Sequence, residues 1–175
     1  MTLANEIVDA GAVSYGDFTL KSGKTSSYYV DMRCLISNPS LLKKISKMIY
    51  EKTNDIKCIA GVPMGGIPYA IYISAIYSVP MVLIRKKPKE HGTCRLVEGN
   101  ISKDTPITLI EDVVTTGNSL LNIIKLIEKE GFKINNIVVI VCRDEQGLEN
   151  IIKLGYSVIS CFNFKNTHLS AIESE

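Results

Sequence analysis

The stretch Ile107-Thr-Leu-Ile-Glu-Asp-Val-Val-Thr-Thr-Gly-Asn-Ser119 says most about the fold of this chain. Its first residues form an apolar run that is typical of a buried strand, and we expect this strand to end at the acid pair Glu111 and Asp112. A small polar turn, 115–119, follows, and the pattern of residues 120–130 predicts an amphipathic helix. A strand, an acid pair, a polar turn and a helix in this order predict an α/β unit with a ligand site at the turn.

The turn and the acid pair together suit a sugar phosphate. Backbone N–H groups at the start of a helix attract an anion, because the unsatisfied donors and the helix dipole point the same way. Carboxylates hold phosphate poorly but accept hydrogen bonds from sugar hydroxyls. Taken alone, the same motif also fits an ordinary strand end with a helix cap. A Walker A loop is excluded because the spacing Gly61 to Gly66 is followed by Ile67-Pro68, and the chain has no Gly-x-Gly-x-x-Gly dinucleotide motif.

Outward from this stretch, strand-like and helix-like patterns alternate. Helices are predicted over 2–12, 39–53, 66–77, 118–130 and 147–154, and strands over 18–20, 28–31, 57–62, 81–85, 106–111, 136–142 and 156–162. We therefore expect a single α/β domain, 1–175, built on a mostly parallel twisted sheet with helices on both faces.

Composition narrows the class of protein. A hydrophobic content of 46% with 22% charged residues excludes a disordered chain, and a net charge of +2 argues against a nucleic-acid-coating surface. Five cysteines without a Cys-x-x-Cys pair, and only two histidines, argue against a zinc site and suggest reduced thiols in a cytoplasmic protein. Residues 58–84 carry no charge and are long enough to span a membrane, but Gly and Pro divide them, so we expect strand, helix and strand instead.

Residues 85–99 break the alternation. Four basic side chains lie within 85–89, and Pro88 and Gly92 prevent a continuous helix. One interpretation is a solvated hairpin that merely keeps the protein soluble. The other is a lid that brings Arg85, Lys86, Lys89 and His91 onto a polyanionic ligand and excludes water. Beside a phosphate-binding turn, the lid is the favoured hypothesis.

At this point the chain resembles a known family. The strand, acid pair and turn resemble the 5-phosphoribosyl-1-pyrophosphate (PRPP) signature of type I phosphoribosyltransferases. Residues 18–33, 85–93 and 143–147 are similar to the substrate segment, the catalytic loop and the late base-binding arginine of orotate phosphoribosyltransferases. Residues 95–99 look most like the transferase domain of UMP synthases.

The resemblance implies a fold and a reaction. The fold is the type I phosphoribosyltransferase fold, with a small N-terminal hood over about 1–35 and a mobile catalytic loop over about 85–99. The reaction joins orotate to PRPP, with Mg²⁺, to give orotidine 5′-monophosphate and pyrophosphate in pyrimidine biosynthesis. Mg²⁺ would be held mainly through PRPP; no direct protein ligand is assigned, and Asp112 is the candidate nearest to it.

The same resemblance implies three sets of site residues. The catalytic set is Lys86, Lys89, His91 and Asp112. The PRPP-binding set is Lys21, Arg85, Lys86, Lys89, His91, Glu111, Asp112, Val113, Val114, Thr115, Thr116, Gly117, Asn118 and Ser119. The orotate-binding set is Lys21, Tyr28, Tyr29, Thr115 and Arg143. Cations at the leaving pyrophosphate and an arginine for an acidic base are what the reaction requires.

The sequence departs from the family pattern at two places, and the resemblance also implies partners. Asn118 stands where a small residue is common, and Met64-Gly65 replaces a Tyr-Lys pair of some members, so that only the backbone of 62–66 could bind pyrophosphate there. We expect a homodimer with the catalytic loop shared across the interface, an orotidylate decarboxylase on a separate chain, and neither nucleic acid nor membrane as a partner. The alternatives are a phosphoribosyltransferase for a purine base and a PRPP-sensing regulator without catalysis.

Overall fold

The protein is built on a five-stranded sheet with the order β3-β6-β7-β8-β9. The computed structural model describes residues 1–19, 23, 25–85, 96–165 and 168–172. The strands β3 (Cys58–Gly61), β6 (Ile107–Val114), β7 (Ile134–Cys142) and β8 (Ser157–Lys165) are parallel, and β9 (His168–Ala171) pairs with β8 in the antiparallel direction. The predicted mostly parallel sheet is confirmed, and β9 is an edge strand that the sequence patterns did not reveal.

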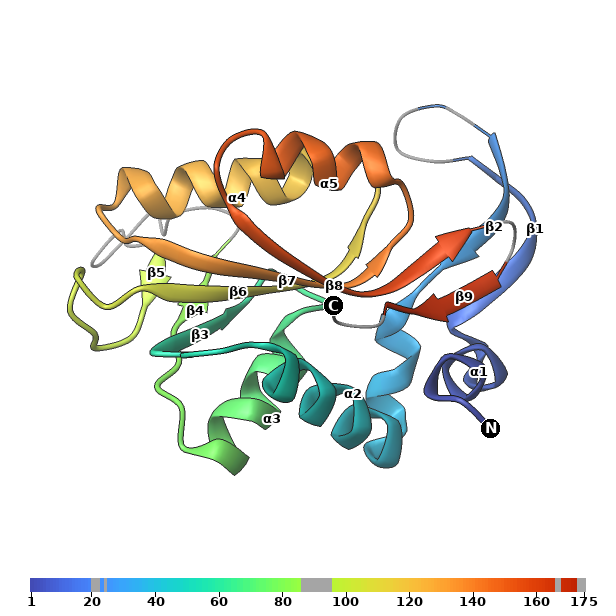
Figure 1. Ribbon diagram of the computed structural model, residues 1–175, viewed down its shortest axis with the longest axis horizontal. Helices are drawn as coiled ribbons and strands as arrows, with labels where there is room; N and C mark the ends of the chain where they lie inside the picture. The colour runs from blue at the N-terminus through green and yellow to red at the C-terminus, as the bar shows by residue number, and fades with distance from the viewer. Residues whose placement is uncertain (20–22, 24, 86–95, 166–167, 173–175) are drawn as a thin grey trace.

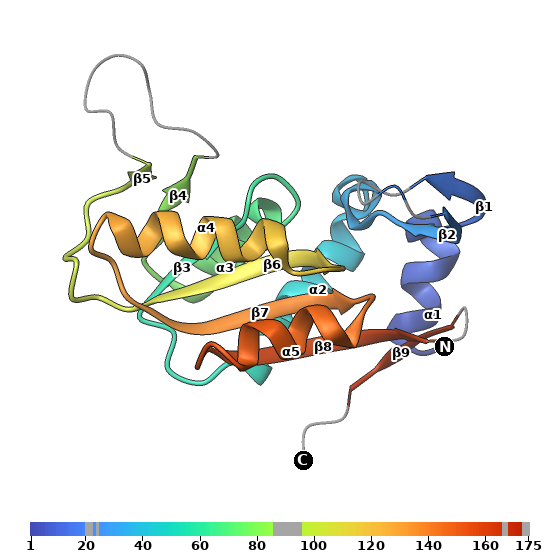
Figure 2. The ribbon, with the colours of Figure 1, turned by 90° about the horizontal axis from the view of Figure 1, so that it is seen from above.

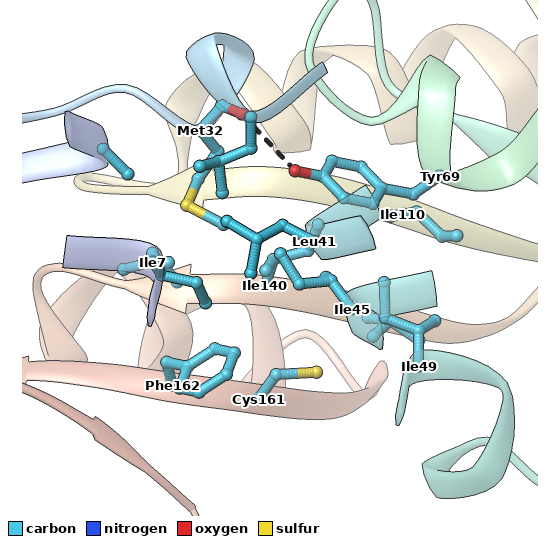
Figure 3. Packing of buried hydrophobic residues seen from close by; sticks show 14 of the residues in the cluster. Ile7, Met32, Leu41, Ile45, Ile49, Tyr69, Ile110, Ile140, Cys161 and Phe162 are labelled. Atoms are coloured by element: carbon cyan, nitrogen blue, oxygen red, sulfur yellow. Dashed lines mark hydrogen bonds between the residues drawn. The ribbon is translucent and has the colours of Figure 1, made fainter. Parts of the chain in front are cut away.

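Helices cover both faces of this sheet (Figure 1). The helices α2 (Pro39–Lys52) and α3 (Ile67–Tyr77) lie on one face, and α4 (Asn118–Lys129) and α5 (Glu145–Ile152) lie on the other. Ile45 and Ile49 of α2 share a buried cluster with Ile110 and Ile140, as Figure 3 shows. A second cluster joins Ile123 and Ile127 of α4 to Leu109 and Val139. Burial on both faces explains why these strands read as continuous apolar runs.

Helix ends follow the capping residues of the sequence. Asn38 caps α2 by accepting a hydrogen bond from the Leu41 N–H at 3.2 Å, and Pro39 occupies the first helical position, so α2 begins at the residue where the sequence predicts its start. Asp144 caps α5 through the Gln146 N–H at 3.0 Å. That cap starts α5 at Glu145, two residues before the predicted start.

The N-terminal region packs at one end of the sheet. Helix α1 (Leu3–Ile7) continues into a π-helical segment (Val8–Ala12) and then into the antiparallel strands β1 (Val13–Thr19) and β2 (Thr25–Val30). A short 3-10 helix (Met32–Ser37) leads on to α2. The carboxyl ends of β6 and β7 point toward this region (Figure 2). The hairpin is longer than the predicted pieces 18–20 and 28–31, because β1 pairs with β2 from Val13 onward.

Two further boundaries differ from the sequence-based prediction. Strand β6 does not end at Glu111: it stays paired with β7 up to Val114, opposite Cys142. In place of a strand over 81–85, β4 covers only Leu83–Ile84 and pairs with an unexpected short strand, β5 (Val97–Glu98). The uncharged stretch divides into β3, α3 and β4 as expected, and no helix in the described part of the chain is long and apolar enough to cross a membrane. Cys34, Cys58 and Cys161 are free thiols.

Candidate functional site

The acid pair lies near the carboxyl end of β6, between its neighbours β3 and β7. Successive side chains of a strand point to opposite faces of the sheet. Leu109 packs in the cluster with α4, and Ile110 packs in the cluster with α2 and α3. Asp112 therefore faces the same side of the sheet as Ile110. Glu111 faces the opposite side, like Leu109. Glu111 is only 7% exposed, whereas Asp112 is half-buried. Of the two carboxylates, Asp112 is therefore the more accessible to a ligand.

The β3–α3 loop, 62–66, lies against the Asp112 carboxylate at Gly65. A Cβ atom built on Gly65 would lie 1.8 Å from Oδ2 of Asp112, so only glycine leaves room for this carboxylate. The next residue, Gly66, lies against the backbone, since its Cβ atom would be 2.0 Å from the Ile110 carbonyl oxygen. That same oxygen accepts the Val62 N–H at 2.8 Å, which ties the loop to β6. The close contact of Gly65 was not predicted from the sequence.

The charge of Asp112 acts on two further side chains. Burial, and secondarily the Asp112 charge, raises the pKa of the Tyr69 hydroxyl, which donates to the Met32 carbonyl oxygen at 3.4 Å (Figure 3). Arg33 forms a two-pronged ion pair with Asp31, with both contacts at 2.7 Å. This pair raises the pKa of Arg33, and Asp112 adds a smaller effect in the same direction. A neutral hydroxyl and a permanent cation thus lie within electrostatic range of Asp112, and sequence reasoning assigned neither of them.

The turn 115–119 joins β6 to α4 and has the features of an anion site. Gly117 adopts a left-handed conformation, with φ of 77°, at the start of α4, and no side chain caps this helix. Thr116, Asn118 and Ser119 are exposed. The uncapped N–H groups of the first turn are therefore directed at whatever occupies the turn, and a phosphate is the ligand that suits them.

The first turn of α5 packs directly against the turn 115–119. A Cβ atom on Gly147 would lie 1.9 Å from the Thr115 carbonyl oxygen. Conversely, a Cβ atom on Gly117 would lie 2.8 Å from the Gly147 carbonyl oxygen. The backbone of the turn thus touches the backbone of α5. Gly147 stands at the end of the predicted base-binding segment, but no pattern in the sequence indicated this contact.

Arg143 follows β7 directly and reaches the N-terminal hairpin. Its backbone N–H donates to the Val114 carbonyl oxygen at 2.9 Å, and its guanidinium lies over the Tyr28 ring, 4.4 Å from the ring centre. The structure thus brings together two of the predicted orotate-binding residues. It does not show the neighbouring Tyr29 in this group: the Tyr29 ring instead lies 5.6 Å from the Phe18 ring, because alternate residues of β2 face opposite ways.

Arg85 is the one predicted basic-loop residue within the described part of the chain. Its Nε donates to the Glu98 carboxylate at 2.9 Å, across the β4–β5 pair. The Glu130 carboxylate accepts the backbone N–H groups of Leu96 and Val97 at 2.6 and 3.3 Å. These contacts hold Arg85, Leu96 and Val97 in place. Lys21, Lys86, Lys89 and His91 lie outside the described residues.

The described acids fit a magnesium ion that is held mainly by a substrate. No group of three or more His, Cys, Asp or Glu side chains suited to a metal ion occurs among the residues with described positions. Mg²⁺ usually takes one or two carboxylates and completes its shell with waters and substrate phosphates. The half-buried Asp112, beside a phosphate-binding turn, is the residue that fits such a role.

Comparisons with known proteins show which proteins this chain is similar to. A family model for the phosphoribosyl transferase domain matches residues 33–171. The chain is 40% identical over 158 residues to the orotate phosphoribosyltransferase of Pyrococcus horikoshii, covering 88% of this chain and 85% of the relative. It is 34% identical to the uridine 5′-monophosphate synthase of Bos taurus, over 86% of this chain but 32% of that protein. The crystal structure of orotate phosphoribosyltransferase from Aeropyrum pernix superposes with a TM-score of 0.80 at 32% identity, covering 91% of this chain and 92% of that one.

Proposed function

The chain belongs to the orotate phosphoribosyltransferase family, and from this premise we propose that its site transfers the 5-phosphoribosyl group of PRPP to orotate. The products are orotidine 5′-monophosphate and pyrophosphate, and the reaction is a step of pyrimidine biosynthesis. One observation of the structure supports this most directly. The ends of the adjacent strands β6 and β7 carry a sugar-phosphate turn and an arginine for an acidic base, joined by the bond from the Arg143 N–H to the Val114 carbonyl oxygen.

Each part of the site has a task in this reaction. The 5′-phosphate binds at the turn 115–119. Asp112, next to the more buried Glu111, accepts hydrogen bonds from the ribose hydroxyls. Arg143, stacked on the Tyr28 ring, holds orotate, and Lys21 and Thr115 complete the base site. Departure of pyrophosphate builds positive charge on the anomeric carbon, and the nearby Asp112 carboxylate stabilises that charge.

The leaving group needs positive charge. Arg85 and, from the resemblance, Lys86, Lys89 and His91 neutralise the negative charge that develops on pyrophosphate. Mg²⁺, when bound with PRPP, supplies additional charge neutralisation on the phosphate oxygens. Because Arg85 is paired with Glu98, it has to exchange this carboxylate for a phosphate oxygen in order to take part.

An absorbance assay tests the activity. The purified protein mixed with PRPP, Mg²⁺ and orotate should consume orotate with release of pyrophosphate, whereas hypoxanthine, guanine and adenine should give no turnover. The reason is that the base site offers a fixed cation, Arg143, which suits a carboxylate and leaves an uncharged purine without a counter-charge. Turnover of a purine in place of orotate, or PRPP binding without turnover of any base, would overturn this assignment.

We also propose that the protein is a homodimer that buries the outer face of α3. The helix is apolar on all sides, yet Ile71 and Ile76 are 50% and 58% exposed, and Leu83 of β4 is 47% exposed. A helix that is apolar all round is normally buried. A second copy is the natural partner, because residues 58–84 carry no charge and a two-fold contact would bring no like charges together. A decarboxylase on a separate chain and a cytoplasmic location stay predictions.

Ile76→Glu should therefore give a monomer. Each copy would bury an unpaired carboxylate in place of an apolar side chain, so the dimer should weaken by at least about a hundredfold in Kd. Sedimentation velocity across a range of protein concentrations measures this. The matched control is Ile152→Glu on α5, 52% exposed on the opposite face of the sheet, which should sediment like the parent. A monomeric parent protein, or equal behaviour of the two variants, would refute the interface.

A further inference from the structure

The hairpin strand β2 holds the guanidinium of Arg143 in one orientation. Nη2 of Arg143 donates to Oγ of Ser26 at 2.7 Å and to the carbonyl oxygen of Tyr28 at 3.2 Å. Both acceptors lie more than a hundred residues away in sequence, so only the fold brings them to the arginine. The Tyr28 ring, 4.4 Å away, sets the plane of the guanidinium, and the two acceptors set which of its edges faces β2.

In this arrangement the proton and both lone pairs of the Ser26 hydroxyl take part in hydrogen bonds. It donates its proton to the Tyr28 carbonyl oxygen at 2.8 Å and accepts the Tyr28 N–H at 3.3 Å. A hydroxyl has one proton and two lone pairs, so the remaining lone pair is the one that Arg143 occupies. The direction of the proton is thereby fixed, and Ser26 can act toward the guanidinium only as an acceptor.

The ring of Tyr28 is itself held in place by a neighbouring aromatic ring. It packs against the ring of Phe164 with centroids 4.4 Å apart, and Phe164 is buried in β8. Tyr28 thus forms a rigid platform between the sheet and Arg143. A guanidinium stacked on such a ring, with Nη2 engaged, keeps its Nη1 and Nε donors for a ligand.

We propose that Ser26 is a positioning residue for base recognition, which fixes Arg143 so that its remaining donors meet orotate. This inference rests on the proposed function, since it assigns Arg143 to the base. Ser26 does not need to touch the base itself. Without its oxygen, Nη2 loses its shortest contact, and the guanidinium becomes free to turn on the Tyr28 ring.

Steady-state kinetics of Ser26→Ala test the proposal. A hydrogen bond to a charged group contributes enough for about a tenfold change in affinity, so KM for orotate should rise about tenfold, with kcat and KM for PRPP within about twofold of the parent. Ser26→Thr keeps the oxygen and should restore KM. Ser27→Ala is the matched control, because Ser27 is exposed on the other side of β2.

A double-mutant cycle separates positioning from a general structural role. In an Arg143→Ala background, Ser26→Ala should raise KM for orotate no further, because the group it positions is gone. An unchanged KM in Ser26→Ala, an equal rise of KM for PRPP, or full additivity with Arg143→Ala would overturn the proposal. Absence of orotate turnover in the parent protein would instead refute the proposed function, so the two failures are distinguishable.

Discussion

Gly65→Ala should reduce kcat/KM about a hundredfold while the protein remains folded. The added methyl would lie 1.8 Å from an oxygen of the Asp112 carboxylate, which has to move aside. A displacement of about 1 Å in a catalytic site can cost about a hundredfold in rate. The atom in the way is the end of a side chain and can rotate, so we expect a loss of only about 1 kcal/mol in the free energy of unfolding. Kinetics with orotate and PRPP, together with urea unfolding, measure both quantities.

Two neighbouring variants make this prediction specific. Met64→Ala changes an exposed side chain of the same loop and should leave the rate unchanged. Gly66→Ala places its methyl 2.0 Å from the Ile110 carbonyl oxygen, which cannot rotate away, so this variant should lose stability as well as activity. Asp112→Asn should reproduce the loss of rate of Gly65→Ala, and the double variant should add little to it. Normal activity of both Gly65→Ala and Asp112→Asn would show that Asp112 has no role in the reaction.

Gly147→Ala should weaken PRPP binding about a hundredfold and destabilise the protein. In an unobstructed helix, alanine would instead be more favourable than glycine by about 0.5–1 kcal/mol, and Gly147 lies within α5 with no unusual φ. The methyl would, however, lie 1.9 Å from the Thr115 carbonyl oxygen, so the turn that holds the 5′-phosphate has to shift. We expect a net loss of about 1–3 kcal/mol in the free energy of unfolding.

Whether Gly147→Ala lowers or raises the free energy of unfolding tests the contact between α5 and the turn. KM for PRPP at saturating orotate and urea unfolding are the two measurements. Gln146→Ala removes only an exposed side chain of the same helix turn, and it should match the parent in KM. A Gly147→Ala protein that is more stable than the parent and binds PRPP normally would contradict the contact between α5 and the turn.

Local sequence patterns were enough for the architecture. The capping residues Asn38 and Pro39 fixed the start of α2, and the apolar run before Glu111 identified the central strand. The structure stacks Arg143 on Tyr28, and the role of both residues in base binding stays a prediction. The end of β6 was predicted three residues too early, because an acid pair usually marks the end of a strand, and here the hydrogen bonds to β7 continue through it.

The close contacts of the site could not be predicted in the same way. Gly117 has a positive φ, a local requirement that favours glycine wherever it occurs. Gly65, Gly66 and Gly147 are not among the glycines with positive φ, and they are needed because another chain segment approaches them. The same holds for Ser26, an ordinary hairpin serine until β7 brings Arg143 to it.

By itself, then, the sequence determined the parallel α/β sheet and the order of its elements, because periodicity, caps and the turn chemistry are local properties of the chain. The family and its reaction were expected from the resemblance of whole segments to a known family. Only the tertiary structure decided which carboxylate is accessible, which glycines leave room for Asp112 and the phosphate turn, and which hydroxyl holds Arg143. These depend on distances between segments such as 26 and 143, or 65 and 112, and such distances exist only after the strands have paired and the helices have packed.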